Sequence, residues 1–170
     1  QKINYWDAET HFEYGDYLKA SQMFEELELI DPDFLPLKYK LGRSYFELDK
    51  KDLAFERLDQ SKDVYPASYY FLAKIQLEEE NTNEALNLIN YILELNPAEN
   101  PTVSQIEAKK LKEEILYAKE AISNPENVLI KNLGEKINTK NPEYVPVISA
   151  GEDFIYFTSR RMHEKNSLDP

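Results

Sequence analysis

Residues 41–66 read LGRSYFELDKKDLAFERLDQSKDVYP, and they contain a spacing that recurs twice elsewhere in the chain. A small residue is followed 12 positions later by an alanine, and 12 positions after that by a proline. The three copies are Ala8, Ala20 and Pro32; Gly42, Ala54 and Pro66; and Ala73, Ala85 and Pro97. They begin 34 and then 31 residues apart, and self-similarity at such a period predicts an array of helical repeats. Arrays of this kind present an extended surface, so the pattern favours binding over catalysis.

The second copy resembles the tetratricopeptide repeat. It carries Leu41-Gly42, Tyr45, Ala54, Leu58 and Pro66. At the position of Tyr45 the other two copies carry His11 and Gln76, which depart from the pattern. At the position of Leu58 every copy is apolar, because the other two carry Phe24 and Ile89. The resemblance covers about residues 1–98 and implies a mainly α fold, a superhelix of three helix pairs. Each pair has an antiparallel helix A and helix B.

Physical chemistry explains why these residue types recur. A small residue on helix A and an alanine on helix B let the two helices of a repeat approach closely. Between the helices, Gly15-Asp16 supplies a break and an N-cap, and Asn81 is expected to cap the third helix B. Asp49 or Asp52 is expected to cap the second.

A further helix is predicted over residues 102–122, starting at Pro101-Thr102 and ending at Ser123-Asn124-Pro125. Its apolar residues recur at steps of three and four and form one stripe: Ala108, Leu111, Ile115, Ala118 and Ile122. Because no partner helix follows, we expect residues 99–125 to cap the open end of the third repeat.

The composition excludes several function classes. The net charge is −12, and residues from Val128 onward carry six basic and six acidic side chains, so the whole excess lies in residues 1–127. Such acidity disfavours nucleic acid. No cysteine is present, His11 and His163 lack neighbours at metal-ligand spacing, and no nucleophile or phosphate-loop motif occurs. We therefore expect no enzyme, no metal, no cofactor and no membrane span.

The candidate partner-binding residues lie on the A helices. Helical spacing places three sets in register on one face: Tyr5, Glu9 and Phe12; Tyr39, Arg43 and Phe46; Tyr70, Lys74 and Leu77, with Glu13, Glu47 and Glu78 beside them. Tyrosine and arginine are favoured anchors at binding surfaces. The alternative is that the tyrosines only pack between adjacent A helices. The single tryptophan, Trp6, is expected to seal the N-terminal end of the array.

After Pro125 the pattern becomes extended. Val128-Leu129-Ile130 is predicted as a short strand, and Val147-Ile148 and Phe154–Phe157 flank a Gly-containing loop as a β-hairpin does. The domains expected are thus residues 1–98, three repeats; 99–125, a capping helix; and 126–170, a β segment.

This tail also resembles a known family. The segments are Asn132–Asn138, Glu143–Ser149 and Phe157–Arg161. They resemble the opening of the WD-like β-propeller in OmpA-family proteins of Bacteroidota that are associated with the Por (type IX) secretion system and carry tetratricopeptide repeats before the propeller. One departure is Ala150–Asp153, where the family's blade turn has Pro-Asp-Gly.

The resemblance implies a protein-interaction scaffold in the periplasm, associated with the outer membrane. The implied partner is an outer-membrane barrel of the PorP/SprF kind or another secretion or gliding component, and peptidoglycan would be bound only through a domain absent from these residues. Two alternatives stay open: a peptide-binding co-chaperone-type module, and a regulatory domain of an envelope enzyme. Gln1 is expected to be either an end produced by processing, such as removal of a secretory signal, or an engineered boundary.

Overall fold

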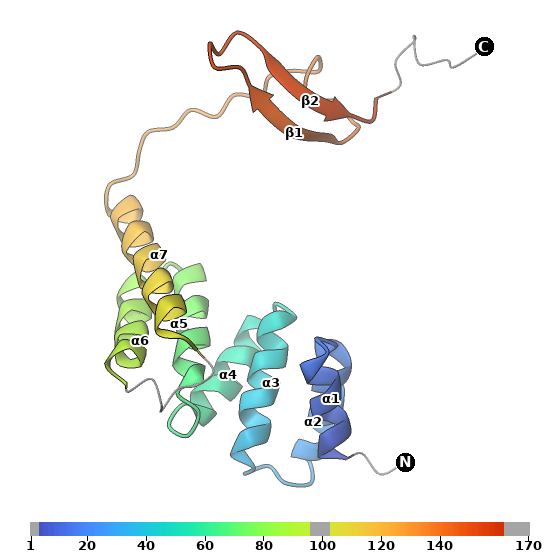
Figure 1. Ribbon diagram of the computed structural model, residues 1–170, viewed down its shortest axis with the longest axis vertical. Coiled ribbons are helices and arrows are strands. Elements are labelled where there is room, and N and C mark those ends of the chain that lie inside the picture. The colour runs from blue at the N-terminus through green and yellow to red at the C-terminus, as the bar shows by residue number, and fades with distance from the viewer. Residues whose placement is uncertain (1–3, 96–102, 162–170) are drawn as a thin grey trace, which may run out of the picture. The chain divides into compact units, whose positions relative to one another are not determined.

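The computed structural model describes residues 4–95 and 103–161. The chain divides into two compact units, residues 1–125 and 126–170. The first unit is helical and the second contains a two-stranded antiparallel sheet, as Figure 1 shows. The predicted fold class, helix pairs followed by a short β segment, is confirmed.

The helices form three consecutive pairs. Their bounds are α1 Tyr5–Glu13, α2 Tyr17–Glu28, α3 Leu35–Glu47, α4 Lys51–Ser61, α5 Ala67–Glu78, α6 Thr82–Glu94 and α7 Gln105–Ser123. We call α1, α3 and α5 the A helices and α2, α4 and α6 the B helices. Each A helix packs on the B helix of its own pair, and each later A helix also packs on the preceding B helix (Figure 1). The pairs therefore stack in chain order.

The repeated small residues lie where the helices of a pair touch. The five alanines at these positions, Ala8, Ala20, Ala54, Ala73 and Ala85, are fully buried, and Pro97 lies outside the described residues. A Cβ added to Gly42 would stand 2.7 Å from Cγ of Leu58 and 3.0 Å from its backbone nitrogen. The prediction of close helix contacts at these positions is confirmed. Phe24, Leu58 and Ile89 are also fully buried and fill the space beside them.

All three A helices end in the same way. Gly15, Asp49 and Glu80 have φ of 77°, 56° and 61°, in the left-handed region that favours glycine. The next backbone N–H then bonds back five residues, as in a Schellman ending: Asp16 to the carbonyl of His11, Lys50 to that of Tyr45, and Asn81 to that of Gln76. The turn geometry is thus conserved among the repeats although two of the three residues are not glycine.

The predicted caps of the B helices are confirmed in one repeat only. Oδ1 of Asp16 accepts a hydrogen bond from the backbone of Lys19 at 3.3 Å. The N-cap of α4 is Lys50, so the prediction of Asp49 or Asp52 is wrong. Asn81 is the N-cap residue of α6, as predicted, but its side chain makes no capping hydrogen bond. The left-handed residue before each cap orients the chain instead.

The outward side of α1 is polar. Leu41 of α3 and Leu72 of α5 are buried against the preceding pair, and the hydroxyl of Tyr45 donates to Glu25 at 2.7 Å. The corresponding residues of α1 are Asp7 and His11, and His11 bonds Asp16 of the next turn at 3.1 Å. A polar outer side is typical of a terminal repeat. Trp6 is 70% exposed, so the prediction that it seals this end is wrong, because polar side chains take that role.

The helix α7 packs on α6 and touches α5, where a further A helix would lie. Ser104 begins it with a reciprocal cap, because its Oγ accepts from the N–H of Glu107 at 3.2 Å while the Glu107 carboxylate accepts from the N–H of Ser104 at 2.9 Å. The helix starts three residues later than predicted, and Pro101-Thr102 lie outside the described residues. Its stripe is buried up to Ile115, whereas Ile122 is 49% exposed, so only the first part covers the third repeat.

In the second unit, β1 (Glu143–Ile148) and β2 (Ile155–Ser159) form the predicted antiparallel hairpin. The register slips between Tyr144 and Val147, where Val145 has φ of 49° and Pro146 follows, as at a β-bulge. Val128-Leu129-Ile130 forms no strand, so that prediction is wrong. An apolar run becomes a strand only when a neighbouring strand takes its backbone hydrogen bonds, and among the described residues none does.

Polar side chains fasten this hairpin to the preceding loop. The carboxylate of Glu143 accepts from the hydroxyls of Thr139 at 2.6 Å and Ser159 at 3.1 Å. The guanidinium of Arg161 donates to the carbonyls of Lys136 and Ile137 at 2.7 and 2.9 Å. The Thr139 hydroxyl holds the pKa of Glu143 below its ordinary value. No residue from 126 to 161 is buried, so hydrogen bonds rather than a core define this unit.

Candidate protein-interaction face

The nine predicted partner-binding residues lie on the three A helices. They make up what we call the A-helix face: Tyr5, Glu9 and Phe12 on α1, Tyr39, Arg43 and Phe46 on α3, and Tyr70, Lys74 and Leu77 on α5. Contacts between neighbouring A helices join these side chains into one row, through residues that the sequence pattern did not single out.

Two of the three tyrosines pack inside the array. The ring of Tyr5 lies 5.9 Å from that of Phe24 and 5.7 Å from that of Phe34. Tyr39 is only 8% exposed and stacks on Tyr65, with ring centroids 5.1 Å apart. Burial, together with the charge of Glu9, raises the pKa of Tyr5 to about 12. The packing alternative therefore describes Tyr5 and Tyr39 better than the binding one.

The third tyrosine lies near α7. Burial raises the pKa of Tyr70, and the carboxylates of Glu107 and Glu114 raise it further. The ammonium of Lys74 stands 5.4 Å from the ring of Tyr70 and 5.5 Å from that of Phe46. This end of the row thus combines an aromatic pair, a lysine and the acidic edge of α7.

At the other end, a lysine joins α1 to α3. Nζ of Lys40 lies 3.0 Å from Glu9 and 3.2 Å from Glu13, and 4.3 Å from the centre of the Phe12 ring. One cation from within the chain therefore serves two carboxylates of α1, which leaves a net negative charge at this end of the row.

In the middle, Arg43 holds two partners. Its Nη2 donates to Glu47 at 2.7 Å, and its guanidinium carbon lies 3.9 Å from the centre of the Phe71 ring. The Phe71 ring in turn meets Phe46 at 5.3 Å, edge to face. Nε of Arg43 is buried and has no hydrogen-bond partner in the structure. Glu78, the last acid of the third set, pairs with Lys51 of α4 at 2.8 Å.

Sequence reasoning missed Lys40 and Phe71, which connect the A helices. Each stands one residue after a predicted tyrosine, and three residues before Arg43 or Lys74. Spacing of three on a helix places residues on the same side. Extending the predicted face by that step would have included both of them, and Trp6 as well.

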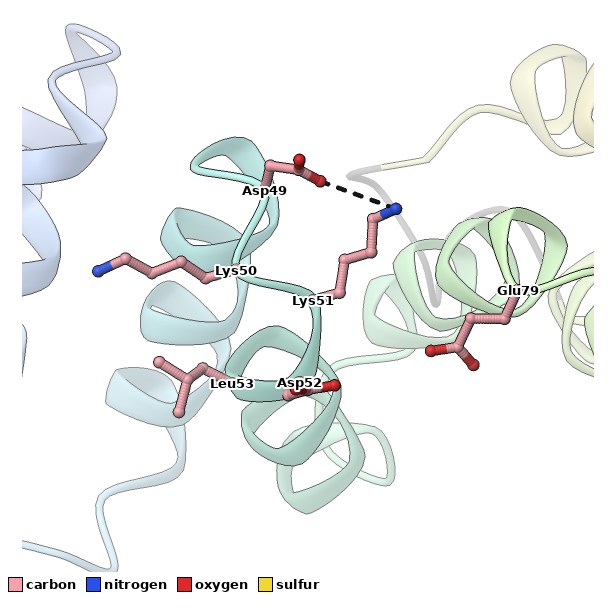
Figure 2. A pocket seen from close by; sticks show the side chains of 6 residues that line it. All are labelled: Asp49, Lys50, Lys51, Asp52, Leu53 and Glu79. Carbon is pink, nitrogen blue, oxygen red and sulfur yellow. Dashed lines mark ion pairs between the residues drawn. The ribbon is translucent and has the colours of Figure 1, made fainter.

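One further concave site on the helical unit lies away from the A-helix face. An open depression of about 530 Å³ lies beside the turn between α3 and α4, lined by Asp49, Lys50, Lys51, Asp52, Leu53 and Glu79. Figure 2 shows Lys51 directed toward Asp49, and the two charges lie 3.8 Å apart. The lining side chains carry three negative and two positive charges, and they include no nucleophile beside a base.

Two further findings concern residues 4–95 and 103–161. No group of three or more histidine, cysteine or acidic side chains in these ranges is arranged to hold a metal ion, and His163 lies outside them. None of the helices in these ranges combines the length and the hydropathy that a membrane span requires.

A scan of protein-family models finds no match to this chain, and a search of curated proteins finds none either. Solved structures do share its fold. The Yersinia enterocolitica type III secretion translocator chaperone SycD has a TM-score of 0.60 at 21% identity, covering 68% of this chain and 83% of that chain.

The first tetratricopeptide domain of human RPAP3 has a TM-score of 0.58 at 19% identity, covering 72% of this chain and 94% of that chain. The first such domain of Spaghetti (RPAP3), bound to the HSP90 peptide SRMEEVD, has 0.57 at 20% identity, covering 67% and 88%. At these identities the likeness shows the fold alone: the helical unit is a tetratricopeptide-type array.

Proposed function

We propose that the helical unit is a protein-interaction module that binds a segment of a partner through the A-helix face. One observation carries the proposal. Aromatic and charged side chains of three successive A helices form a single row through Glu9, Lys40, Arg43, Phe71 and Lys74. Phe71 is buried, but the charged members of the row lie at a partly exposed surface, where ion pairs contribute little stability, so a binding role explains these charges better than folding does.

The co-chaperone-type alternative is favoured by one solved structure, in which a similar fold holds the acidic peptide SRMEEVD. An acidic peptide needs unpaired cations. Here Lys40 is held by Glu9 and Glu13, and Arg43 by Glu47, so two of the three basic side chains of this face already have anionic partners. The charges of this face therefore disfavour an acidic peptide as its ligand.

The more specific proposal is a scaffold in the periplasm, associated with the outer membrane, in a protein of the Por (type IX) secretion kind. The sequence resemblance over residues 128–161 supports it, and so does the hairpin at 143–159, which suits the start of a propeller blade. The partner proposed is an outer-membrane barrel of the PorP/SprF kind. The proposed domains are residues 1–98, 99–125 and 126–170.

The test uses charge reversal on the A-helix face. Lys74→Glu should abolish capture of the partner from a detergent extract of outer membranes, while the matched reversal Lys19→Glu on the exposed side of α2 should not. Arg43→Glu is the second variant, and circular dichroism checks that each variant folds. Equal recovery of every partner with all variants would move the interface off this face. Failure of the unmodified chain to capture any outer-membrane protein would contradict the periplasmic scaffold.

A further inference from the structure

Trp6 occupies the place in α1 that Lys40 occupies in α3 and Phe71 in α5, at the same 34- and 31-residue steps. In both later repeats the side chain at this place reaches back to the preceding A helix. Lys40 meets the carboxylates and the Phe12 ring of α1, and Phe71 meets Arg43 and Phe46 of α3. Trp6 therefore stands at the repeat position whose side chain, in the two later repeats, contacts a neighbouring A helix.

The tryptophan is the odd member of this series. Among the described A-helix rings, Phe12, Phe46, Tyr70 and Phe71 each have a cation within 5.5 Å of the ring centre, and Tyr5 and Tyr39 pack on other rings. Within residues 4–95, the aromatic contact of the Trp6 ring is with the edge of Tyr5, at 6.1 Å, and Trp6 is 70% exposed. Tryptophan is the side chain that attracts cations best.

The charge around Trp6 is negative. Glu9 and Glu13 follow it by three and seven residues on the same side of α1, and one lysine, Lys40, serves both. The side chain of Glu13 is 65% exposed. Since residues 1–127 carry the whole net charge of −12, the surrounding field also attracts cations and repels anions.

We propose that Trp6, with the carboxylates of Glu9 and Glu13, receives an arginine or lysine side chain of the partner segment. The cation lies on the indole as Arg43 lies on Phe71 within the array, and Glu13 supplies the counter-charge. The partner is therefore a segment with basic side chains, opposite in sign to the HSP90 peptide bound by a protein of similar fold. This inference rests on the proposed binding role of the helical unit and names the chemistry of its ligand.

The chain provides its own reporter, because Trp6 is the only tryptophan. The probes are three capped peptides of one length: Gly-Arg-Gly-Gly-Arg-Gly, the same peptide with citrulline for arginine, and the same with glutamate. We expect the arginine peptide to change the fluorescence of Trp6 saturably, with an affinity about fivefold above that of neutral citrulline. The glutamate peptide should leave the fluorescence unchanged.

Two variants locate the effect. Glu13→Gln should reduce the preference for arginine about twofold. Tyr117→Ala, which removes an exposed aromatic ring from α7, should leave it unchanged. Equal affinity for arginine and citrulline, or a response to the glutamate peptide, would overturn the inference. If capture of the native partner still depends on Lys74 in that case, the proposed function stands without this site; if capture is also independent of Lys74, both fail.

Discussion

The helical array and the hairpin unit both contain many apolar residues but use them in opposite ways. In the array, Phe24, Leu41, Leu58 and Ile89 are fully buried. In the hairpin unit, Val147, Ile148, Phe154 and Tyr156 are all more than half exposed, and none of the residues from 126 to 161 is buried. The array is held together by apolar packing, whereas the hairpin is held by hydrogen bonds, the Arg161–Glu143 ion pair and contacts of Arg160 and Arg161 with aromatic rings.

The array therefore has an apolar core of its own, whereas the described residues of the hairpin unit have none. Two strands without a covered face are marginal in water, because their backbone hydrogen bonds replace bonds to solvent at little gain. We therefore expect residues 143–159 to be ordered only in contact with another packed surface.

The largest expected effect comes from truncating the two kinds of apolar side chain. Leu58→Ala should lower the free energy of unfolding of the array by about 2–5 kcal/mol, since it removes fully buried methyl groups and leaves a cavity. Val147→Ala in β1 should change it by less than about 0.5 kcal/mol. Urea unfolding followed by helix circular dichroism measures both. Similar losses from the two variants would break the distinction between the units.

A second variant tests which contact limits the space beside Gly42. Gly42→Ala should destabilise the array by about 1–2 kcal/mol, because overpacking against Leu58 outweighs the helix propensity that alanine adds. The same change in the Leu58→Ala background should cost less, since the nearest side-chain atoms are gone. The double-mutant cycle in urea tests this, and strictly additive losses would show that Leu58 is not the obstacle.

A smaller gain is expected at a turn. Glu80→Gly should stabilise the array by about 1 kcal/mol, since glycine adopts the left-handed φ of this residue without the steric cost of a side chain. Gly15, which already has this conformation, gives the reference for the opposite change, and Gly15→Ala should destabilise by a similar amount. Melting temperatures of the two variants check both signs. A lower melting temperature for Glu80→Gly would mean that the glutamate side chain contributes something the turn needs.

The smallest effect concerns acid. The folded pKa of Glu143 lies below its ordinary value of 4.5, so the order it contributes is present above pH 4.5 and is lost as the pH falls through the lower folded value. Amide shifts of Thr139 and Ser159 in nuclear magnetic resonance spectra should therefore move together in acid. In Glu143→Gln they should stay constant over the same range; if they still move, another group controls the loop.

Much of the array could be predicted because its determinants are local. The spacing of Gly42 and Ala54 identifies both helices of a repeat, and burial then follows from periodicity. The turns were harder to predict. Asp49 and Glu80 have a left-handed backbone conformation that only coordinates reveal. Side-chain caps were therefore predicted at Asp49 or Asp52 and at Asn81, where none forms. The strand predicted at Val128-Leu129-Ile130 was wrong for a different reason. A strand needs a neighbouring strand to pair with, and a sequence pattern does not show whether one is present.

For the candidate face, the sequence predicted the helices that carry it and the register of its residues. It missed Lys40 and Phe71 because both act across helices, and pairing between helices depends on how successive repeats are rotated. The sequence predicted that Trp6 covers the N-terminal end of the array, because a large aromatic side chain is usually buried. The polar side of α1, with Asp7 and His11, makes a seal unnecessary and leaves the ring exposed.

Hydrogen exchange of the whole chain, measured by mass spectrometry on dilute monomer, tests the difference between the units most directly. Amides of α3 to α6 should exchange slowly and together, because they open only when the packed array unfolds. Amides of residues 143–159 should exchange orders of magnitude faster, near the rate of an unstructured peptide. Slow exchange across 147–158 in the monomer would contradict this, because the hairpin would then be stable without any covering protein.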